Sequence, residues 1–185
     1  MPSAIACNGK SDYMYNQESI KKGIREISDY PKKGIMFKDI TTLLKEKELF
    51  REVIDKAAEM VESDTEYIVG IESRGFIFGS ALAYRTGKGF IPIRKKGKLP
   101  YDKISKEYDL EYGKDTIEMH KDALHKGAKV VVVDDLLATG GTAQAAYSLV
   151  ETAGGEVSSF IFLIELTELK GRERLPCKVF SLVQY

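Results

Sequence analysis

The chain has 185 residues, and its 28 basic and 28 acidic side chains give a formal net charge of zero. This length suits one domain. With 43% hydrophobic and 30% charged residues, the chain is expected to be globular and soluble, not disordered or fibrous. A neutral chain is not expected to be a general nucleic-acid binder. No apolar run approaches the ~18 residues of a membrane span, and the N-terminus lacks a signal-peptide core, so no membrane partner is expected.

The cysteine and histidine content gives neither a disulfide framework nor a metal cluster. The two cysteines are Cys7 and Cys177, and Cys177 precedes an apolar stretch, which is typical of a small buried side chain. His120 and His125 are five residues apart, so they do not share a helix face at ligand spacing. A reducing, cytoplasmic location is the expectation that follows.

The first third of the chain predicts a tail and two helices. Residues 1–16 are polar and patternless and are expected to form a loose tail. Isoleucines at helical spacing predict a helix over residues 17–28, and Pro31 ends it. The stretch after Pro31 is expected to be irregular or briefly extended. Apolar residues on one face predict a further amphipathic helix over residues 46–62.

Short apolar strands then alternate with helices along the rest of the chain. The expected strands are residues 67–71, 89–94, 116–121, 128–135, 156–166 and 178–185. The expected helices are residues 75–87 and 141–155. This alternation predicts an α/β domain with a central, mostly parallel sheet of about five strands and helices on both faces.

Residues 95–114 interrupt the alternation. They are polar, contain six lysines and show no apolar period. A stretch of this length inside a compact domain is usually a functional lid or a long hairpin, and the sequence leaves both alternatives open.

The most informative stretch is residues 130–142, VVVVDDLLATGGT. Four valines predict a strand buried on both faces, and Asp134 and Asp135 stand at its carboxyl end, where α/β proteins bind ligands. In the turn that follows, glycines allow close approach of the backbone, and the start of the next helix offers free N–H groups. The pattern predicts a phosphate cradle, beside carboxylates suited to a sugar diol or to the water shell of a metal.

Other nucleotide-binding loops do not fit this stretch, since it has neither the lysine of a P-loop nor the G-x-G-x-x-G of a dinucleotide site. Residues 130–142 instead resemble the phosphoribosyl pyrophosphate (PRPP) motif of the type I phosphoribosyltransferases: four hydrophobic residues, two acids and a short turn ending in Thr-Gly-Gly-Thr. The resemblance implies the fold of that family, with a small N-terminal hood over the base and a flexible catalytic loop.

Five further segments resemble the adenine-specific branch of the family, in family order. They are PKKGIMFKD (31–39), IESRGFIFG (71–79), IRKKGKLP (93–100), YDLEYG (108–113) and ELTELKGRE (165–173). The resemblance covers residues 17–185. It implies a pentosyltransferase of purine salvage that makes AMP and pyrophosphate from adenine and PRPP with Mg²⁺, commonly as a homodimer. It also implies a hood over residues 17–45 and a core over residues 46–185, with the flexible loop near 95–114.

The resemblance implies roles for the residues around the PRPP motif. Asp134 and Asp135 would hold the ribose hydroxyls, directly or through Mg²⁺, and because PRPP itself carries the metal no direct metal ligand is expected. The 5′-phosphate would be held by the backbone amides and hydroxyls of Ala138, Thr139, Gly140, Gly141 and Thr142.

The leaving pyrophosphate is implied to meet two basic segments. One is the loop after the first core strand, in which Arg74 supplies a planar charged fork. The other lies at the start of the long polar stretch, which in relatives is mobile and closes over the site. The residues concerned are Glu72, Ser73, Arg74, Gly75, Arg94, Lys95 and Lys98.

Base binding and catalysis are implied for two other segments. Phe37 would stack on adenine, while the main-chain groups of Met36 and Lys38 would contact the edge of the base. Glu111 would be the acid nearest the base and would share a proton from N7 as N9 attacks C1, through an oxocarbenium-like transition state with inversion. Tyr112 would pack the loop closed, and Arg74 is included among the catalytic residues.

Two alternative functions remain open. A transferase for a 6-oxopurine would keep the same PRPP motif, although such relatives usually carry a different acidic pattern there. A non-catalytic PRPP-sensing regulator would share the fold, but such proteins typically add a DNA-binding domain, and residues 1–16 are too few for one.

Overall fold

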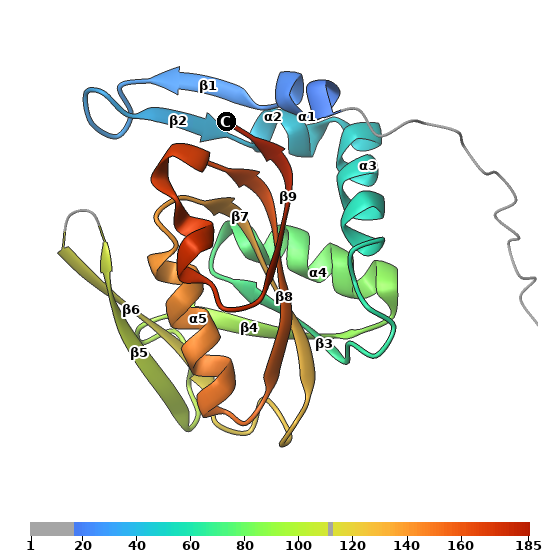
Figure 1. Cartoon of the computed structure of the whole chain (residues 1–185), viewed down its shortest axis with the longest axis vertical. Coiled ribbons are helices and arrows are strands. Elements are labelled where there is room, and N and C mark those ends of the chain that lie inside the picture. The colour runs from blue at the N-terminus through green and yellow to red at the C-terminus, as the bar shows by residue number, and fades with distance from the viewer. Residues whose placement is uncertain (1–16, 111–112) are drawn as a thin grey trace, which may run out of the picture.

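The computed structural model describes residues 17–110 and 113–185, and α1 (Gln17–Gly23) opens the described chain. The helix predicted over residues 17–28 is wrong beyond Gly23, because the chain turns there into β1 (Arg25–Ser28), which pairs antiparallel with β2 (Met36–Asp39). Ile27 faces Phe37 across this hairpin and is 36% exposed, so its helical spacing reflected no core position. Figure 1 shows the hairpin lying across one end of the molecule.

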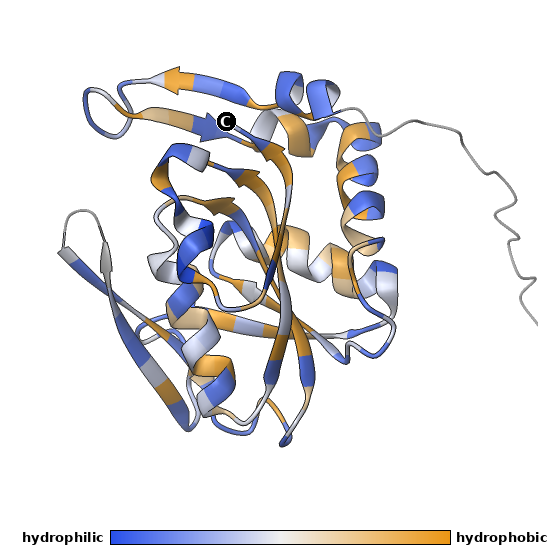
Figure 2. Ribbon diagram, viewed as in Figure 1, coloured by the Kyte–Doolittle hydropathy of each residue, from blue (hydrophilic) through white to orange (hydrophobic). Residues whose placement is uncertain are grey.

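Two helices connect this hairpin to the sheet. They are α2 (Thr41–Lys45) and α3 (Lys47–Ala58), which confirms the amphipathic helix predicted in this region. Figure 2 shows hydrophobic and hydrophilic residues alternating along α3. Its apolar face buries Val53, Ile54 and Ala57.

The central sheet has seven strands in the order β5-β6-β4-β3-β7-β8-β9. Five of them run parallel: β4, β3, β7, β8 and β9. The bounds are β3 (Tyr67–Ile71), β4 (Gly89–Lys95), β5 (Lys103–Leu110), β6 (Gly113–His120), β7 (Lys129–Leu137), β8 (Glu156–Glu165) and β9 (Lys178–Gln184). The α/β fold class and its mostly parallel sheet are confirmed. The five parallel strands agree with the expected number, and β6 covers the strand predicted over residues 116–121. With β5 it extends the sheet as an antiparallel hairpin, one of the two alternatives left open for residues 95–114.

The long polar stretch therefore contributes a strand to a hairpin. Ser105 and Glu118 lie opposite each other on β5 and β6. The buried carboxylate of Glu118 accepts the Gly97 N–H at 2.9 Å and lies 3.4 Å from the Lys103 ammonium. This carboxylate fixes the base of the hairpin. Closure of the stretch over the site stays a prediction.

Helices cover both faces of the sheet. The first is α4 (Arg74–Thr86), and the second, on the opposite face, is α5 (Gly141–Thr152). The short 3-10 helices η1 (Thr167–Leu169) and η2 (Gly171–Arg174) connect β8 to β9. No helix of the described chain is both long enough and apolar enough to pass through a bilayer.

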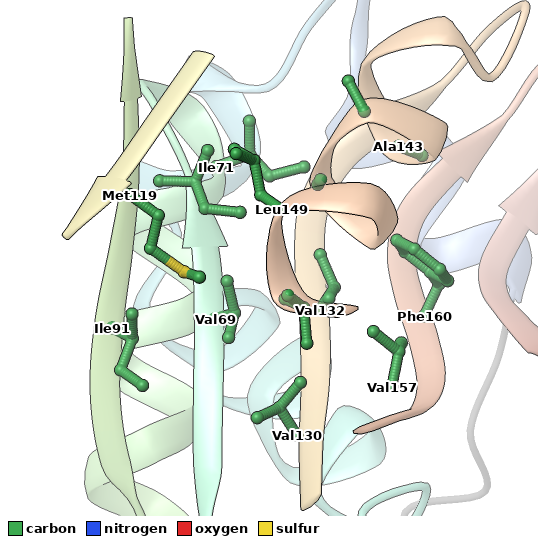
Figure 3. Close-up of a cluster of buried hydrophobic side chains, with 14 of the residues drawn as sticks. Val69, Ile71, Ile91, Met119, Val130, Val132, Ala143, Leu149, Val157 and Phe160 are labelled. Carbon is green, nitrogen blue, oxygen red and sulfur yellow. The ribbon is translucent and has the colours of Figure 1, made fainter. Parts of the chain in front are cut away.

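The four valines of β7 contribute to two hydrophobic cores, one on each face of the sheet. Val130 and Val132 point to the α5 side, where they pack with Leu149 (Figure 3). Val131 and Val133 belong to the cluster on the α4 side. Because successive side chains of a strand alternate between faces, the unbroken valine run contributes to both cores, and β7 lies at the centre of the five parallel strands.

Candidate active site

A cavity of about 820 Å³ lies between the β1–β2 hairpin and the carboxyl end of β7. Its walls come from residues 31–38, Arg74 at the start of α4, the end of β7 with the turn into α5, Phe162 of β8, the segment after β8, and Tyr185. The carboxyl ends of parallel strands are where α/β proteins bind ligands. The location is therefore the one that the sequence predicted.

Residues 138–142, which form the turn after β7 and the first two residues of α5, are named the phosphate loop. All five of its residues line the cavity: Ala138, Thr139, Gly140, Gly141 and Thr142. Gly140 has φ +82° and is the residue that precedes α5, so the first N–H groups of the helix lie beside the cavity. Free N–H groups and the helix dipole favour an anion there.

Asp134 and Asp135 stand where β7 meets this loop. Asp134 lines the cavity, and its Oδ1 accepts the Asp135 N–H at 2.9 Å. Asp135 is buried, and its Oδ2 lies 2.9 Å from Arg74 Nε, although this oxygen accepts no directed hydrogen bond within the described chain. Loss of hydration raises the pKa of both carboxyls, and the repulsion between them raises that of Asp134 further. Asp134 therefore presents a carboxylate to the cavity that suits a ribose hydroxyl or a water on Mg²⁺, whereas Asp135 does not line the cavity and is paired with Arg74.

Arg74, the first residue of α4, connects the two ends of the cavity. Besides Asp135, its guanidinium lies 5.3 Å from the centre of the Phe37 ring, and it donates to the Lys38 carbonyl at 3.4 Å. Gly75, the next residue, lets the start of α4 pack closely on β7, because a Cβ there would lie 2.7 Å from the Val133 carbonyl oxygen. Arg74 thus lies between the acidic pair and the β2 strand.

The other residues predicted to meet pyrophosphate lie outside the cavity walls: Glu72, Ser73 and Gly75 lie between β3 and the first turn of α4, and Arg94, Lys95 and Lys98 lie at or just after the end of β4. Arg94 donates through Nε and Nη2 to Glu72, each at 3.2 Å, and the Lys95 N–H adds a third bond at 3.0 Å. Burial alone would raise the pKa of Glu72, but these hydrogen bonds outweigh it and lower that pKa. The Arg94 Nη1 donates to the carbonyl of exposed Lys98. Glu72 and Ser73 are joined by a cis peptide bond.

The opposite end of the cavity is formed by β2. Met36, Phe37 and Lys38 all line it, and Phe37 meets the Tyr30 ring edge-on at a centroid distance of 5.1 Å. The Lys38 side chain is buried, although its ammonium pairs with the half-exposed Glu26. A residue that the sequence did not indicate, Tyr185, places its ring 3.4 Å from that ammonium.

Leu166 and Leu169 also line the cavity, from the segment after β8. The signal for them was present in the 165–173 motif, which served only to recognise the branch. Glu111 and Tyr112, predicted to be catalytic, lie outside the described residues. Their roles, like those of the other site residues, stay predictions.

A family model described as the phosphoribosyl transferase domain matches residues 39–183. The chain therefore belongs to the phosphoribosyltransferase family.

Within this family the relatives are adenine phosphoribosyltransferases. The chain is 58% identical over 170 residues to that of Brachyspira hyodysenteriae, a match covering 90% of this chain and 99% of the relative. It is 57% identical over 169 residues to that of Acetivibrio thermocellus, with the same coverage of both chains.

Solved structures agree with this placement. The adenine phosphoribosyltransferase of Thermoanaerobacter pseudethanolicus superimposes with a TM-score of 0.89 at 53% identity, covering 92% of this chain and all of that one. The Saccharomyces cerevisiae enzyme, solved with adenine and an imino-altritol bisphosphate, has a TM-score of 0.84 at 40% identity, covering 90% and 97%. The type I fold and the adenine branch predicted from the sequence are confirmed.

Proposed function

We propose that the enzyme transfers the 5-phosphoribosyl group of PRPP to N9 of adenine, giving AMP and pyrophosphate in purine salvage. The observation that carries this proposal is that one cavity is lined both by the phosphate loop and by the Met36–Lys38 strand. A phosphate site and an aromatic base site that share a cavity suit a nucleoside monophosphate and the two substrates from which it forms.

At the phosphate end, the amides and hydroxyls of Ala138–Thr142 bind the 5′-phosphate of PRPP. Asp134 and Asp135 bind the ribose hydroxyls, directly or through a water on Mg²⁺. Mg²⁺ bound with PRPP would supply positive charge to the pyrophosphate oxygens. Both carboxyls have raised pKa values in the free protein, and a bound hydroxyl or hydrated cation favours their charged form.

At the base end, Phe37 stacks on the purine, and the backbone of Met36 and Lys38 contacts its edge. Arg74 lies close enough to Phe37 to meet the same base or the phosphates leaving C1. Glu111 takes or shares the N7 proton as N9 attacks, which offsets the positive charge that develops on the purine. Tyr112 packs the loop closed and excludes water.

Departing pyrophosphate meets the cations at the end of β4. Glu72 holds Arg94 through two hydrogen bonds, so the guanidinium is oriented before substrate arrives. Lys95 and Lys98 add positive charge beside it. These groups lie outside the cavity walls of the free protein, so in this proposal closure of the 95–114 segment brings them to the pyrophosphate.

We further propose a cytoplasmic homodimer. The outer face of α4 carries Tyr84, which is 92% exposed, and Ile77, which is 39% exposed. Aromatic and aliphatic side chains exposed on a helix whose first residue is Arg74 suit an interface beside the site. Analytical ultracentrifugation of the wild type and of Tyr84→Glu tests this: a dimer that the variant dissociates supports it, and a monomeric wild type contradicts it.

The function is tested by a panel of bases. Pyrophosphate release is measured with PRPP and Mg²⁺ in the presence of adenine, hypoxanthine, guanine, xanthine or orotate. We expect turnover with adenine alone. Turnover with a 6-oxopurine would retain the PRPP site and overturn the base assignment. Tight PRPP binding without turnover of any base would favour the sensor alternative.

A further inference from the structure

The segment between β8 and β9, which contains η1 and η2, lies against the phosphate loop at Gly171. At Gly171 a Cβ would overlap the carbonyl oxygen of Ala138 and lie 2.9 Å from the Gly140 nitrogen. In turn, a Cβ at Gly140 would lie 2.5 Å from the Gly171 carbonyl oxygen. The two glycine backbones are therefore in direct contact, and the position of Gly171 limits the positions that the phosphate loop can take.

A network of charged and polar groups holds Gly171 in place. The next residue, Arg172, forms a two-pronged pair with Glu165 at the end of β8, with Nε to Oε1 at 3.0 Å and Nη2 to Oε2 at 2.5 Å. Its Nη1 donates to the Val179 carbonyl on β9. Ser181 and Gln184 donate to the second oxygen of Glu165.

Glu165 is a buried carboxylate, 4% exposed, that receives donors from both sides. Arg172 is the first cause of the lowering of its pKa, and the hydrogen bonds from Ser181 and Gln184 add to this effect. The carboxylate is therefore charged at neutral pH, and the planar Arg172 fork fixes its own backbone relative to two strands.

The same segment also faces the cavity. The Leu166 N–H donates to the Leu137 carbonyl at 2.9 Å, which joins the segment to the end of β7 just before the phosphate loop. Leu166 and Leu169 line the cavity. Figure 1 shows the segment beside the carboxyl end of β7 and the first turn of α5. One short stretch thus contacts the phosphate loop through Gly171 and forms part of the cavity wall through Leu166 and Leu169.

We propose that Glu165 and Arg172 are positioning residues for the 5′-phosphate: their ion pair presses the Gly171 backbone against Ala138 and Gly140 and thereby sets the direction of the loop N–H groups. The inference rests on the proposed function, because it needs the phosphate loop to bind that phosphate. Neither side chain touches the ligand. Their effect therefore depends on whether a ligand carries a 5′-phosphate.

AMP and adenosine differ only in that phosphate and make the test selective. Dissociation constants for both are measured by calorimetry on the full chain, for the wild type and for Arg172→Ala and Gly171→Ala. We expect both variants to weaken AMP binding by about tenfold or more, the loss expected when one hydrogen bond to a charged oxygen is misdirected. Adenosine binding is expected to change by less than about twofold, since base and ribose contacts persist.

Gly155→Ala is the matched control. A Cβ there would meet the side chains of Leu124 at 2.7 Å and Val150 at 3.0 Å, at the end of α5 remote from the phosphate loop. It crowds the core without touching the loop, so AMP and adenosine binding are both expected to stay as in the wild type. A selective loss of AMP affinity in this control would show that general destabilisation produces the effect, and would overturn the inference.

Arg172→Lys and Glu165→Gln keep the test decisive if Arg172→Ala does not fold. Arg172→Lys keeps the positive charge but loses the two-pronged geometry, and Glu165→Gln keeps the shape but loses the negative charge and one acceptor oxygen, so each is expected to weaken AMP binding selectively, by a smaller factor. Folded variants that bind AMP like the wild type, or that lose AMP and adenosine affinity equally, would overturn the inference. A wild type that binds no AMP would instead refute the proposed function itself.

Discussion

The two ends of the cavity differ in how they are held: one is a surface of backbone groups, and the other is a hairpin attached by side-chain contacts. At the phosphate end, backbone groups form the surface. They belong to a turn that follows β7, a strand whose valines are buried, and this turn packs against the Gly171 backbone. At the base end, the hairpin strand β1 is exposed at all four residues. Side chains attach this hairpin: Arg25 pairs with Asp39 at 2.7 Å, and Lys38 pairs with Glu26 under the Tyr185 ring.

This difference predicts how the two ends respond to change. A surface made of main-chain groups tolerates side-chain substitution but is disrupted when the backbone is displaced. A surface attached by side chains is weakened by degrees as its contacts are removed. Changes at the phosphate end should therefore act on PRPP steeply, and changes at the base end should act on adenine gradually.

The largest effect is expected from Gly140→Ala. The residue has φ +82°, and its new Cβ would collide with Gly171, so the phosphate loop must move. A displacement of this kind can cost about 100-fold in efficiency. We expect initial-rate kinetics to show it as a raised KM for PRPP, with a much smaller change for adenine.

Gly34→Ala is the counterpart in the hairpin. It has φ +89° but nothing within 4 Å of the position of a Cβ. Only the cost of the backbone conformation applies, about 1 kcal/mol. Kinetics that change as much in Gly34→Ala as in Gly140→Ala would contradict the contrast between the two ends.

Phe37→Ala removes the proposed stacking surface. Stacking on an aromatic ring is worth about 1–3 kcal/mol per base, so the KM for adenine should rise by roughly 5-fold to 150-fold while the KM for PRPP stays near that of the wild type. Phe37→Leu, which keeps an apolar surface, should show an intermediate value. An equal rise for both substrates would show that Phe37 supports the whole cavity instead of the base.

Lys38→Met and Tyr185→Leu should have smaller effects of the same kind. Each removes the cation–π contact that holds β2 to the last strand, worth about 1–2 kcal/mol when it is desolvated. We expect a several-fold rise in the KM for adenine with kcat nearly unchanged. Lys38→Arg and Tyr185→Phe preserve the contact and should restore the KM. If they fail to do so, the ring and the ammonium do not position β2.

The last prediction concerns the effect of Asp39 on the stability of the fold and not on either KM. The Thr41 backbone N–H, then the Thr41 hydroxyl and Arg25, lower the pKa of this carboxyl from 3.8 to about 2. A lowered pKa in the folded state contributes stability above pH 3.8, and the contribution is lost as pH falls through about 2. Asp39→Asn should therefore reduce the free energy of unfolding at pH 7 by about 1–3 kcal/mol and by less near pH 2, as measured by denaturant titration. An equal reduction at both pH values would contradict this.

The backbone structure at the phosphate end was predictable because neighbouring residues in the sequence determine it. Four successive valines require a strand buried on both faces, and Thr-Gly-Gly-Thr before a helix requires a turn with free N–H groups, wherever the rest of the chain lies. The limits of β3, β7 and α5 follow from the same local patterns and differ from the predicted ones by a few residues at most.

The base end was less predictable because its contacts join distant segments. Ile27 fits a helical period, yet pairing with β2 decides its conformation. No local pattern places Tyr185 over Lys38 or gives Glu165 and Arg172 a part in supporting a loop on β7. Those contacts depend on the order of β7, β8 and β9 in the sheet, which emerges only from the fold.

The most direct test of the division between the two ends is a double-variant cycle of Gly140→Ala and Phe37→Ala. The measured quantities are the KM values for PRPP and adenine in the wild type, both single variants and the double variant, in the forward reaction with Mg²⁺. The account predicts that each single variant raises the KM of its own substrate and that the free-energy effects add to within about 0.5 kcal/mol. Single variants that each raise both KM values equally, or a strongly non-additive double variant, would contradict it.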